Sequence, residues 1–228
     1  MTSLPGGDAL YPAERPEPRE LARMRWTIPN ILTVMRLLAA PGVAFAFVLF
    51  DRPYADWIAF GLFILAALTD WVDGRLARAW QQETNFGRMM DPIADKAMVV
   101  IALAVIVGLW GPKALLLVPV AFILLREVFV SGLREFLGSK AGKLKVTYLA
   151  KWKTTAQMVA IPVLLLAGVF EYDRRHNAPW VSDWFHDWMS WILSNGGLVL
   201  IWIAGLLTIM TGYDYLMKAL PFLRDRNR

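Results

Sequence analysis

Six long apolar stretches dominate this 228-residue sequence and constrain its fold more than any other feature. Hydrophobic residues make up 57% of the chain, above the roughly 45–50% of a soluble domain. A helix needs about 20 mostly apolar residues to cross the hydrocarbon core of a bilayer. The sequence therefore predicts an all-α integral membrane protein with six transmembrane helices, over 30–50, 55–79, 92–110, 114–137, 148–170 and 190–217.

Positively charged residues are distributed unevenly between the two sides of these stretches. With the N-terminus inside, the outer connections hold only four of the 24 Lys and Arg residues, which are Arg52, Lys113, Arg174 and Arg175. Because cytoplasmic segments of membrane proteins are enriched in Lys and Arg, we expect both termini in the cytoplasm. The expected location is the cell (inner) membrane.

The chain ends differ in composition from the apolar region between them. Residues 1–25 are Pro-rich and charged, and we expect a largely unstructured cytoplasmic tail there. Residues 26–220 form the expected six-helix transmembrane domain, and 221–228 a short cytoplasmic tail. The net charge of +5 comes from basic residues that flank apolar stretches. Attraction to anionic lipid headgroups explains this pattern, so nucleic acid is not an expected partner.

The scarcity of cysteine and histidine argues against a zinc site and against histidine-based catalysis. The sequence has no cysteine, which excludes disulfides and thiolate ligands, and only two histidines, His176 and His186. Neither histidine is assigned a role, and His186 is expected to be a solvated polar residue.

Tryptophans cluster before the last apolar stretch. Trp180, Trp184 and Trp188 are spaced four apart, and Trp191 follows. This spacing predicts one face of a helix at the outer membrane interface, where indole rings prefer to lie. A functional aromatic box is the alternative interpretation.

Four aspartates surround the connection after the second apolar stretch, where the sequence reads TDWVDGRLARAW over 69–80. Asp70 and Asp73 share a helix face, and so do Asp91 and Asp95, four residues apart. Asp91 and Pro92 resemble the start of a helix, since Pro is tolerated in the first turn. The short connection predicts that the second and third spans are antiparallel neighbours. All four carboxylates then converge at the cytoplasmic end.

Converging carboxylates need a compensating cation. Oxygen ligands favour Mg²⁺, Mn²⁺ or Ca²⁺, and two such ions about 3.5–4 Å apart can clamp a phosphoryl group. Gly74 and Ala77 leave room beside the helix, and Arg78 suits a diphosphate. The alternative is that the acids merely end two helices and pair with nearby cations. Ionisable side chains within membrane-spanning helices are usually functional, which favours the metal site over this alternative. The cations in question are Arg75, Arg78, Arg88 and Lys96.

The pattern D-x2-D-G-x2-A-R-x8-G-x3-D-x3-D runs from Asp70 to Asp95 and resembles the signature of the CDP-alcohol phosphotransferases. The six-span layout is similar to that family's fold. The resemblance implies a homodimer with two Mg²⁺ or Mn²⁺ ions, and a general base at Asp95 that also touches the second metal. It implies metal ligands at Asp70, Asp73 and Asp91, and a frame for the cytidine diphosphate at Gly74, Ala77, Arg78 and Gly87.

Three further segments resemble the phosphatidylglycerophosphate synthases of that family, namely 27–41, 124–136 and 145–162. This resemblance implies CDP-diacylglycerol and sn-glycerol 3-phosphate as substrates, with phosphatidylglycerophosphate and CMP as products. It also implies that Asn30 and Thr33 bind CDP-diacylglycerol. These two residues share a three-residue spacing with Arg36.

Basic residues on the fourth and fifth spans favour the same acceptor on physical grounds. A cation cluster near the carboxylates suits a doubly charged phosphate better than an uncharged alcohol. Glu127 and Glu135 either orient the neighbouring guanidiniums or pair with other cations. Lys140, Lys143 and Lys145 are assigned to membrane topology alone, and topology is the alternative for the whole set. The expected phosphate-binding residues are Arg126, Arg134, Lys151 and Lys153.

Other functions remain open at this point. Within the family, the acceptor could be serine, inositol phosphate or phosphatidylglycerol. A divalent-cation transporter would need acids near the bilayer midplane, whereas these are expected at the cytoplasmic helix ends. A purely structural membrane scaffold would leave the fixed spacing of the motif unexplained.

Overall fold

The computed structural model describes residues 27–80, 84–138, 148–176 and 183–223, and these ranges hold six α-helices and no strand. Each helix is long and apolar enough to cross a membrane. The chain is therefore an all-α, multi-pass membrane protein, as the sequence predicts. The helices are α2 (Ile28–Leu49), α3 (Tyr54–Trp80), α4 (Asn85–Trp110), α5 (Ala114–Leu137), α6 (Tyr148–His176) and α7 (Asp183–Leu223).

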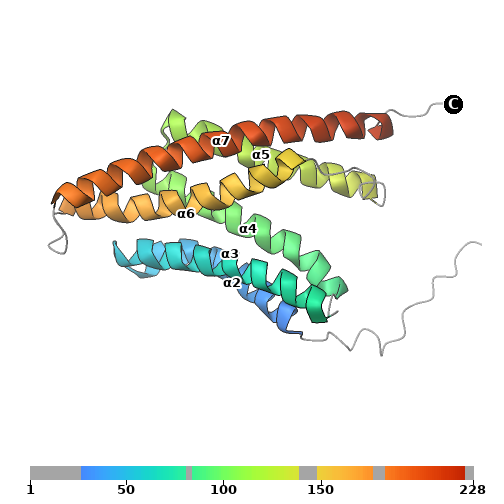
Figure 1. Ribbon diagram of the computed structural model, residues 1–228, viewed down its shortest axis with the longest axis horizontal. Helices are drawn as coiled ribbons and strands as arrows, with labels where there is room; N and C mark the ends of the chain where they lie inside the picture. Colours follow the sequence, from blue (N-terminus) through green and yellow to red (C-terminus); the bar gives the residue numbers. More distant parts are fainter. Residues whose placement is uncertain (1–26, 81–83, 139–147, 177–182, 224–228) are drawn as a thin grey trace, which may run out of the picture.

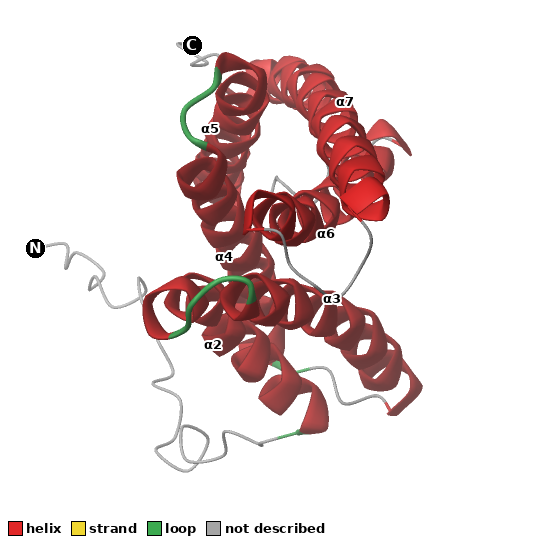
Figure 2. Ribbon diagram, turned by 90° about the vertical axis from the view of Figure 1, so that its left-hand side faces the viewer, coloured by secondary structure: helices red, strands yellow, loops and turns green. Residues whose placement is uncertain are grey.

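The six helices alternate in direction along the long axis of the molecule (Figure 1). The start of α2 and the end of α7 are on opposite edges of the bundle but both towards the right of Figure 1, and we call this end of the molecule the site end. The opposite end is called the far end. Figure 2 looks along the bundle and shows α4 and α6 between the α2–α3 pair and the α5–α7 pair.

The packing of α2 corrects one expectation. The second and third predicted spans are not direct neighbours: α2 packs extensively against both α3 and α4, and the described parts of α3 and α4 share no comparable interface. The buried face of α2 explains this position. Its second half buries the small residues Ala40, Val43 and Ala46, which allow two helix backbones to approach closely. Its first half buries polar side chains instead.

The start of α4 is the second correction. The expected start at Asp91–Pro92 is wrong, because the helix begins at Asn85 and Pro92 lies inside it. Thr84 caps this start, since its Oγ1 accepts a hydrogen bond from the Gly87 N–H at 3.0 Å. The extra turns place Asp91 within the helix rather than at its end.

The tryptophan segment is continuous with the last span, because α7 begins at Asp183. The exposed rings of Trp184 and Trp188 stack with their centroids 6.2 Å apart, while Trp180 lies outside the described residues. His186 is buried, with 5% of its surface exposed, so the expectation of a solvated histidine is wrong. α7 continues to Leu223, three residues past the expected domain boundary at 220.

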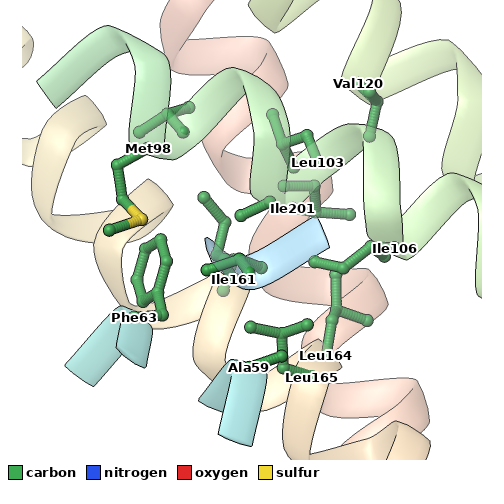
Figure 3. Close-up of a cluster of buried hydrophobic side chains, with 14 of the residues drawn as sticks. Ala59, Phe63, Met98, Leu103, Ile106, Val120, Ile161, Leu164, Leu165 and Ile201 are labelled. Carbon is green, nitrogen blue, oxygen red and sulfur yellow. The ribbon is translucent and has the colours of Figure 1, made fainter. Parts of the chain in front are cut away.

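Apolar side chains from α3, α4, α6 and α7 interlock in the middle of the bundle (Figure 3). Phe63, Met98 and Ile161 belong to this core, and each is at most 3% exposed. Because lipid is as apolar as these side chains, such helices are held together by packing contacts rather than by exclusion from water. Met98 is one turn from Asp95 and Phe63 is two turns from Asp70. The core thereby fixes the helices that carry the polar groups at the site end.

Candidate active site

A single guanidinium from α2 gathers three of the four aspartates. Arg36 Nη1 lies 2.5 Å from Oδ1 of both Asp70 and Asp95. The other terminal nitrogen, Nη2, donates to Asp73 Oδ2. The Arg36 side chain is 2% exposed, Asp73 is 7% exposed, and the Asp70 and Asp95 side chains are almost half exposed. Because α2 lies between α3 and α4, its buried cation can reach carboxylates on both helices.

The fourth aspartate is held by a neighbouring residue of the same α2 face. The buried Thr33 hydroxyl lies 2.7 Å from Asp91 Oδ1 and 3.0 Å from the Pro29 carbonyl oxygen. A hydroxyl has one hydrogen, so Thr33 donates it to one of these two acceptors. The contact ties Asp91 to α2 one turn away from Arg36.

Asn30 completes this polar face at the start of α2. The Thr84 hydroxyl donates to Asn30 Oδ1 at 2.8 Å and accepts from the Gly87 N–H. A Cβ atom on residue 87 would lie 2.9 Å from Asn30 Oδ1, so a larger residue there would require the Asn30 side chain to shift. Asn30 and Thr33 thus contact protein groups and are buried, at 3% and 2% exposure.

The chemistry of this cluster fits a divalent ion, although Arg36 now supplies the positive charge. Within the described ranges, no three acidic or histidine side chains are already arranged at metal-binding distances. Three of the carboxylates, on Asp70, Asp73 and Asp95, instead surround the guanidinium, as expected for clustered acids that need a compensating cation. Their hard oxygen atoms are the donors that Mg²⁺ and Mn²⁺ prefer. An ion could bind once the guanidinium gives up its place.

Asp95 also borders a second feature, a cavity of about 290 Å³ between α4, α5 and α6. This volume is close to the lower end of the roughly 300–1,000 Å³ range of small-molecule sites. Four basic side chains line it, and Asp95 and Glu127 are its only acidic lining residues in the part of the chain that is described. We call it the basic cavity. Its cations are Lys96, Arg126, Arg134 and Lys153.

Glu127 lies among these cations. It accepts a hydrogen bond from Lys153 Nζ, and Arg126 Nη1 lies 3.2 Å from its Oε1. Lys153 is buried, at 4% exposure, so it needs this counter-ion. Lys96 Nζ donates to the Ser131 hydroxyl at 2.5 Å. Arg134 is exposed and lies 5.5 Å from the centre of the Tyr215 ring.

The structure brings most of the predicted acceptor residues together, but not all. Arg126, Arg134 and Lys153 line the basic cavity, whereas Lys151 is exposed on α6 and does not. Gly74 follows Asp73 on α3. Ala77 and Arg78 continue that helix, and their side chains lie outside the described part of the chain.

Two of the nearby cations named in the alternative interpretation, Arg75 and Lys96, make other contacts in the described part of the chain. Arg75 stacks over the Trp71 ring at 3.9 Å, and Lys96 contacts Ser131. The cation that holds the acids is Arg36, which sequence analysis did not assign to the site. Its three-residue spacing after Asn30 and Thr33 was the available signal, since these positions share one helix face.

The fold and this geometry define a class of protein. Carboxylates beside a cation-lined cavity, at one end of a membrane-spanning bundle, are features of membrane enzymes that act on phosphorylated substrates. A family model described as CDP-alcohol phosphatidyltransferase matches residues 26–210. The chain therefore belongs to the CDP-alcohol phosphatidyltransferase family, which generally uses divalent metal ions.

Several curated relatives share the name CDP-diacylglycerol–glycerol-3-phosphate 3-phosphatidyltransferase. The protein of that name from Cereibacter sphaeroides is 57% identical over 223 residues, covering 89% of this chain and 99% of the relative. The one from Haemophilus influenzae is 34% identical over 208 residues, covering 89% and 98%. The one from Rickettsia bellii is 38% identical over 188 residues, covering 82% and 92%.

Proposed function

We propose that this chain transfers the phosphatidyl group of CDP-diacylglycerol to sn-glycerol 3-phosphate, giving phosphatidylglycerophosphate and CMP. The observation that carries the proposal is the shared position of Asp95, which contacts Arg36 in the acid cluster and also lines the basic cavity. A donor diphosphate beside the acids would thereby meet an acceptor phosphate among the cations. Family membership and the names of the relatives support the same reaction.

Asp70, Asp73 and Asp91 would hold the divalent ions, a pair of Mg²⁺ or Mn²⁺, with Asp95 as a further contact. Bound there, the ions would neutralise the diphosphate and make its phosphorus more electrophilic. Arg36 would then release three carboxylates. Thr33 would keep Asp91 in position through its hydroxyl.

Asp95 would act as the general base. It would accept the proton of the C1 hydroxyl of glycerol 3-phosphate while that oxygen bonds to the phosphorus that carries the diacylglycerol. The bond from this phosphorus to the bridging oxygen breaks, and CMP leaves with the electron pair. Replacing Asp95 with Asn should lower kcat by about 10²–10⁴-fold. Near-normal turnover by this variant would refute the base assignment.

The basic cavity would bind the acceptor phosphate through Arg126, Arg134 and Lys153. Guanidinium and ammonium groups bind phosphate by charge-assisted hydrogen bonds. Lys151 would help by attracting the acceptor from its exposed position at the start of α6. An uncharged acceptor would bring no second anion for Arg126 and Lys153, which contact Glu127 in this structure.

The nucleotide would lie along α3 and the start of α4, beside Gly74, Ala77, Arg78 and Gly87. Asn30 would contribute by holding Thr84 and Gly87 in place, since its side chain is already bonded there. Direct contacts of Asn30 and Thr33 with CDP-diacylglycerol remain predictions.

The site end is proposed to face the cytoplasm at the inner membrane. This assignment rests on the distribution of Lys and Arg along the chain. Three of the basic residues that this proposal assigns to the outer side of the membrane line a common pocket at the far end. They are Arg52, Lys113 and Arg175. A homodimer, as the family resemblance implies, is proposed as the assembly.

An acceptor assay tests the proposed function. Purified protein in detergent micelles with CDP-diacylglycerol and Mg²⁺ would be given glycerol 3-phosphate, serine, inositol phosphate or phosphatidylglycerol, and CMP release would be measured. We expect release only with glycerol 3-phosphate. Equal or faster release with another acceptor would reassign the substrate. Metal uptake into liposomes without CMP release with any acceptor would favour a transporter.

A further inference from the structure

Glu127 is a carboxylate placed where an anionic substrate group would be expected. Its side chain is 14% exposed and borders the basic cavity. It contacts Arg126 and Lys153, two of the cations assigned above to the acceptor phosphate. No other carboxylate in the described ranges lies within ion-pair distance of either cation.

The cavity without Glu127 would hold an excess of positive charge. Its lining contributes four cations, and Asp95 already pairs with Arg36 outside the lining. Lys153 is almost fully buried, and an unpaired buried ammonium is costly. Glu127 therefore stabilises the protein when no anion is bound.

We propose that Glu127 is a resident counter-ion, which occupies the acceptor-phosphate position and exchanges with that phosphate during turnover. The phosphate of the incoming acceptor binds Arg126 and Lys153 in place of the Glu127 carboxylate. The carboxylate gives up its contacts with these two cations and moves towards the open cavity. This inference rests on the proposed function, because it requires the basic cavity to bind the acceptor phosphate.

The exchange has a consequence for product release. The transferred lipid keeps the phosphate that came with glycerol 3-phosphate, so the same cations hold substrate and product. A carboxylate that competes for Arg126 and Lys153 weakens both complexes and returns to its partners when product leaves. Tight binding of the substrate in its ground state does not accelerate the chemical step. The lower affinity for glycerol 3-phosphate therefore has little effect on the rate when this substrate is saturating.

The test is Glu127→Gln, which removes the charge and keeps the shape. Glycerol 3-phosphate should bind on the order of tenfold more tightly or better, measured as Kd by calorimetry without CDP-diacylglycerol. Steady-state kinetics should show a lower KM together with a lower kcat, because product leaves more slowly. A carboxylate that only orients Arg126 and Lys153 predicts the opposite, a higher KM, and that result would overturn the proposal.

Thermal unfolding provides a second measurement if the variant is unstable. Glu127→Gln should unfold at a lower temperature than wild type without ligand, and inorganic phosphate should raise its Tm more than that of wild type. Equal phosphate effects on both proteins would contradict the exchange.

Glu171→Gln is the matched control. Glu171 also pairs with cations, Arg174 and Arg175, but at the far end of the bundle. Its replacement should leave the Kd and KM for glycerol 3-phosphate unchanged. Absence of transfer to glycerol 3-phosphate by wild type would refute the proposed function. Transfer by wild type with no change of Kd in Glu127→Gln would refute only the counter-ion.

Discussion

Arg36 and Asp95 are 59 residues apart in the sequence, and Nη1 of the arginine donates to Oδ1 of the aspartate at 2.5 Å. The same guanidinium also holds Asp70 and Asp73. One side chain of α2 thus neutralises acids from both α3 and α4. It occupies the place in which the proposed reaction requires divalent ions.

Replacing Arg36 with Met should destabilise the metal-free protein and make it more responsive to metal. Removing one partner of a buried ion pair costs roughly 3–5 kcal/mol, and the lower figure applies because two of the acids are half exposed. Mn²⁺ should raise the Tm of the variant more than that of wild type, since no guanidinium competes with it. Thermal unfolding with and without Mn²⁺ measures both effects.

The control for this prediction is Arg52→Met. Arg52 pairs with the buried Asp56 at the far end, at 2.6 Å. This variant should also lose stability, but Mn²⁺ should not restore it. Equal rescue of both variants, or of neither, would show that the acid cluster does not bind the metal in place of Arg36.

Thr33→Val should weaken metal binding without disrupting the fold. The substitution keeps the side-chain volume and removes the hydroxyl that lies 2.7 Å from Asp91 Oδ1. Loss of a residue that positions a metal ligand typically costs about 10–100-fold in metal affinity. Calorimetric titration with Mn²⁺ measures the change. Thr211→Val, which removes a hydroxyl that bonds to α7 carbonyls, should leave the affinity as in wild type.

Gly87→Ala should destabilise the start of α4. The new Cβ would lie 2.9 Å from Asn30 Oδ1 and would force apart the Asn30–Thr84 contact. Overpacking of this kind costs about 1–3 kcal/mol. Gly61→Ala is the comparison, because nothing lies within 4 Å of its added Cβ, and helix propensity alone favours Ala by roughly 0.5–1 kcal/mol. Unfolding midpoints should therefore move in opposite directions.

The absence of cysteine from the chain allows a direct test of orientation. Single cysteines at Lys113, at the far end, and at Glu135, near the site end, would both be exposed. A membrane-impermeant maleimide added to spheroplasts, whose inner membrane is intact, should label Lys113→Cys and not Glu135→Cys. The reverse pattern would place the site end outside.

The sequence was sufficient to predict the number of helices and the residues of the acid cluster. Hydropathy defines spans because a lipid-exposed backbone must satisfy its own hydrogen bonds. The motif from Asp70 to Asp95 indicated which carboxylates lie together, since positions three and four apart share a helix face.

The order of helices in space could not be predicted in the same way. A short connection suggested that α3 and α4 pack directly, but the buried small residues of α2 place it between them. The role of Arg36 was missed because its spacing after Asn30 and Thr33 indicates only a shared helix face, and does not indicate a partner 59 residues away. Pro92 suggested a helix start, whereas the Thr84 cap lies eight residues earlier.

Metal dependence of the reaction is the most direct test of the central claim. CMP release by the purified protein, with CDP-diacylglycerol and glycerol 3-phosphate both present, would be followed as free Mg²⁺ or Mn²⁺ is raised from zero in chelator. We predict no release without metal, saturation as the acid cluster fills, and a strongly reduced rate for Asp73→Asn at every concentration. Undiminished release in chelator, or a normal metal response in Asp73→Asn, would contradict the account.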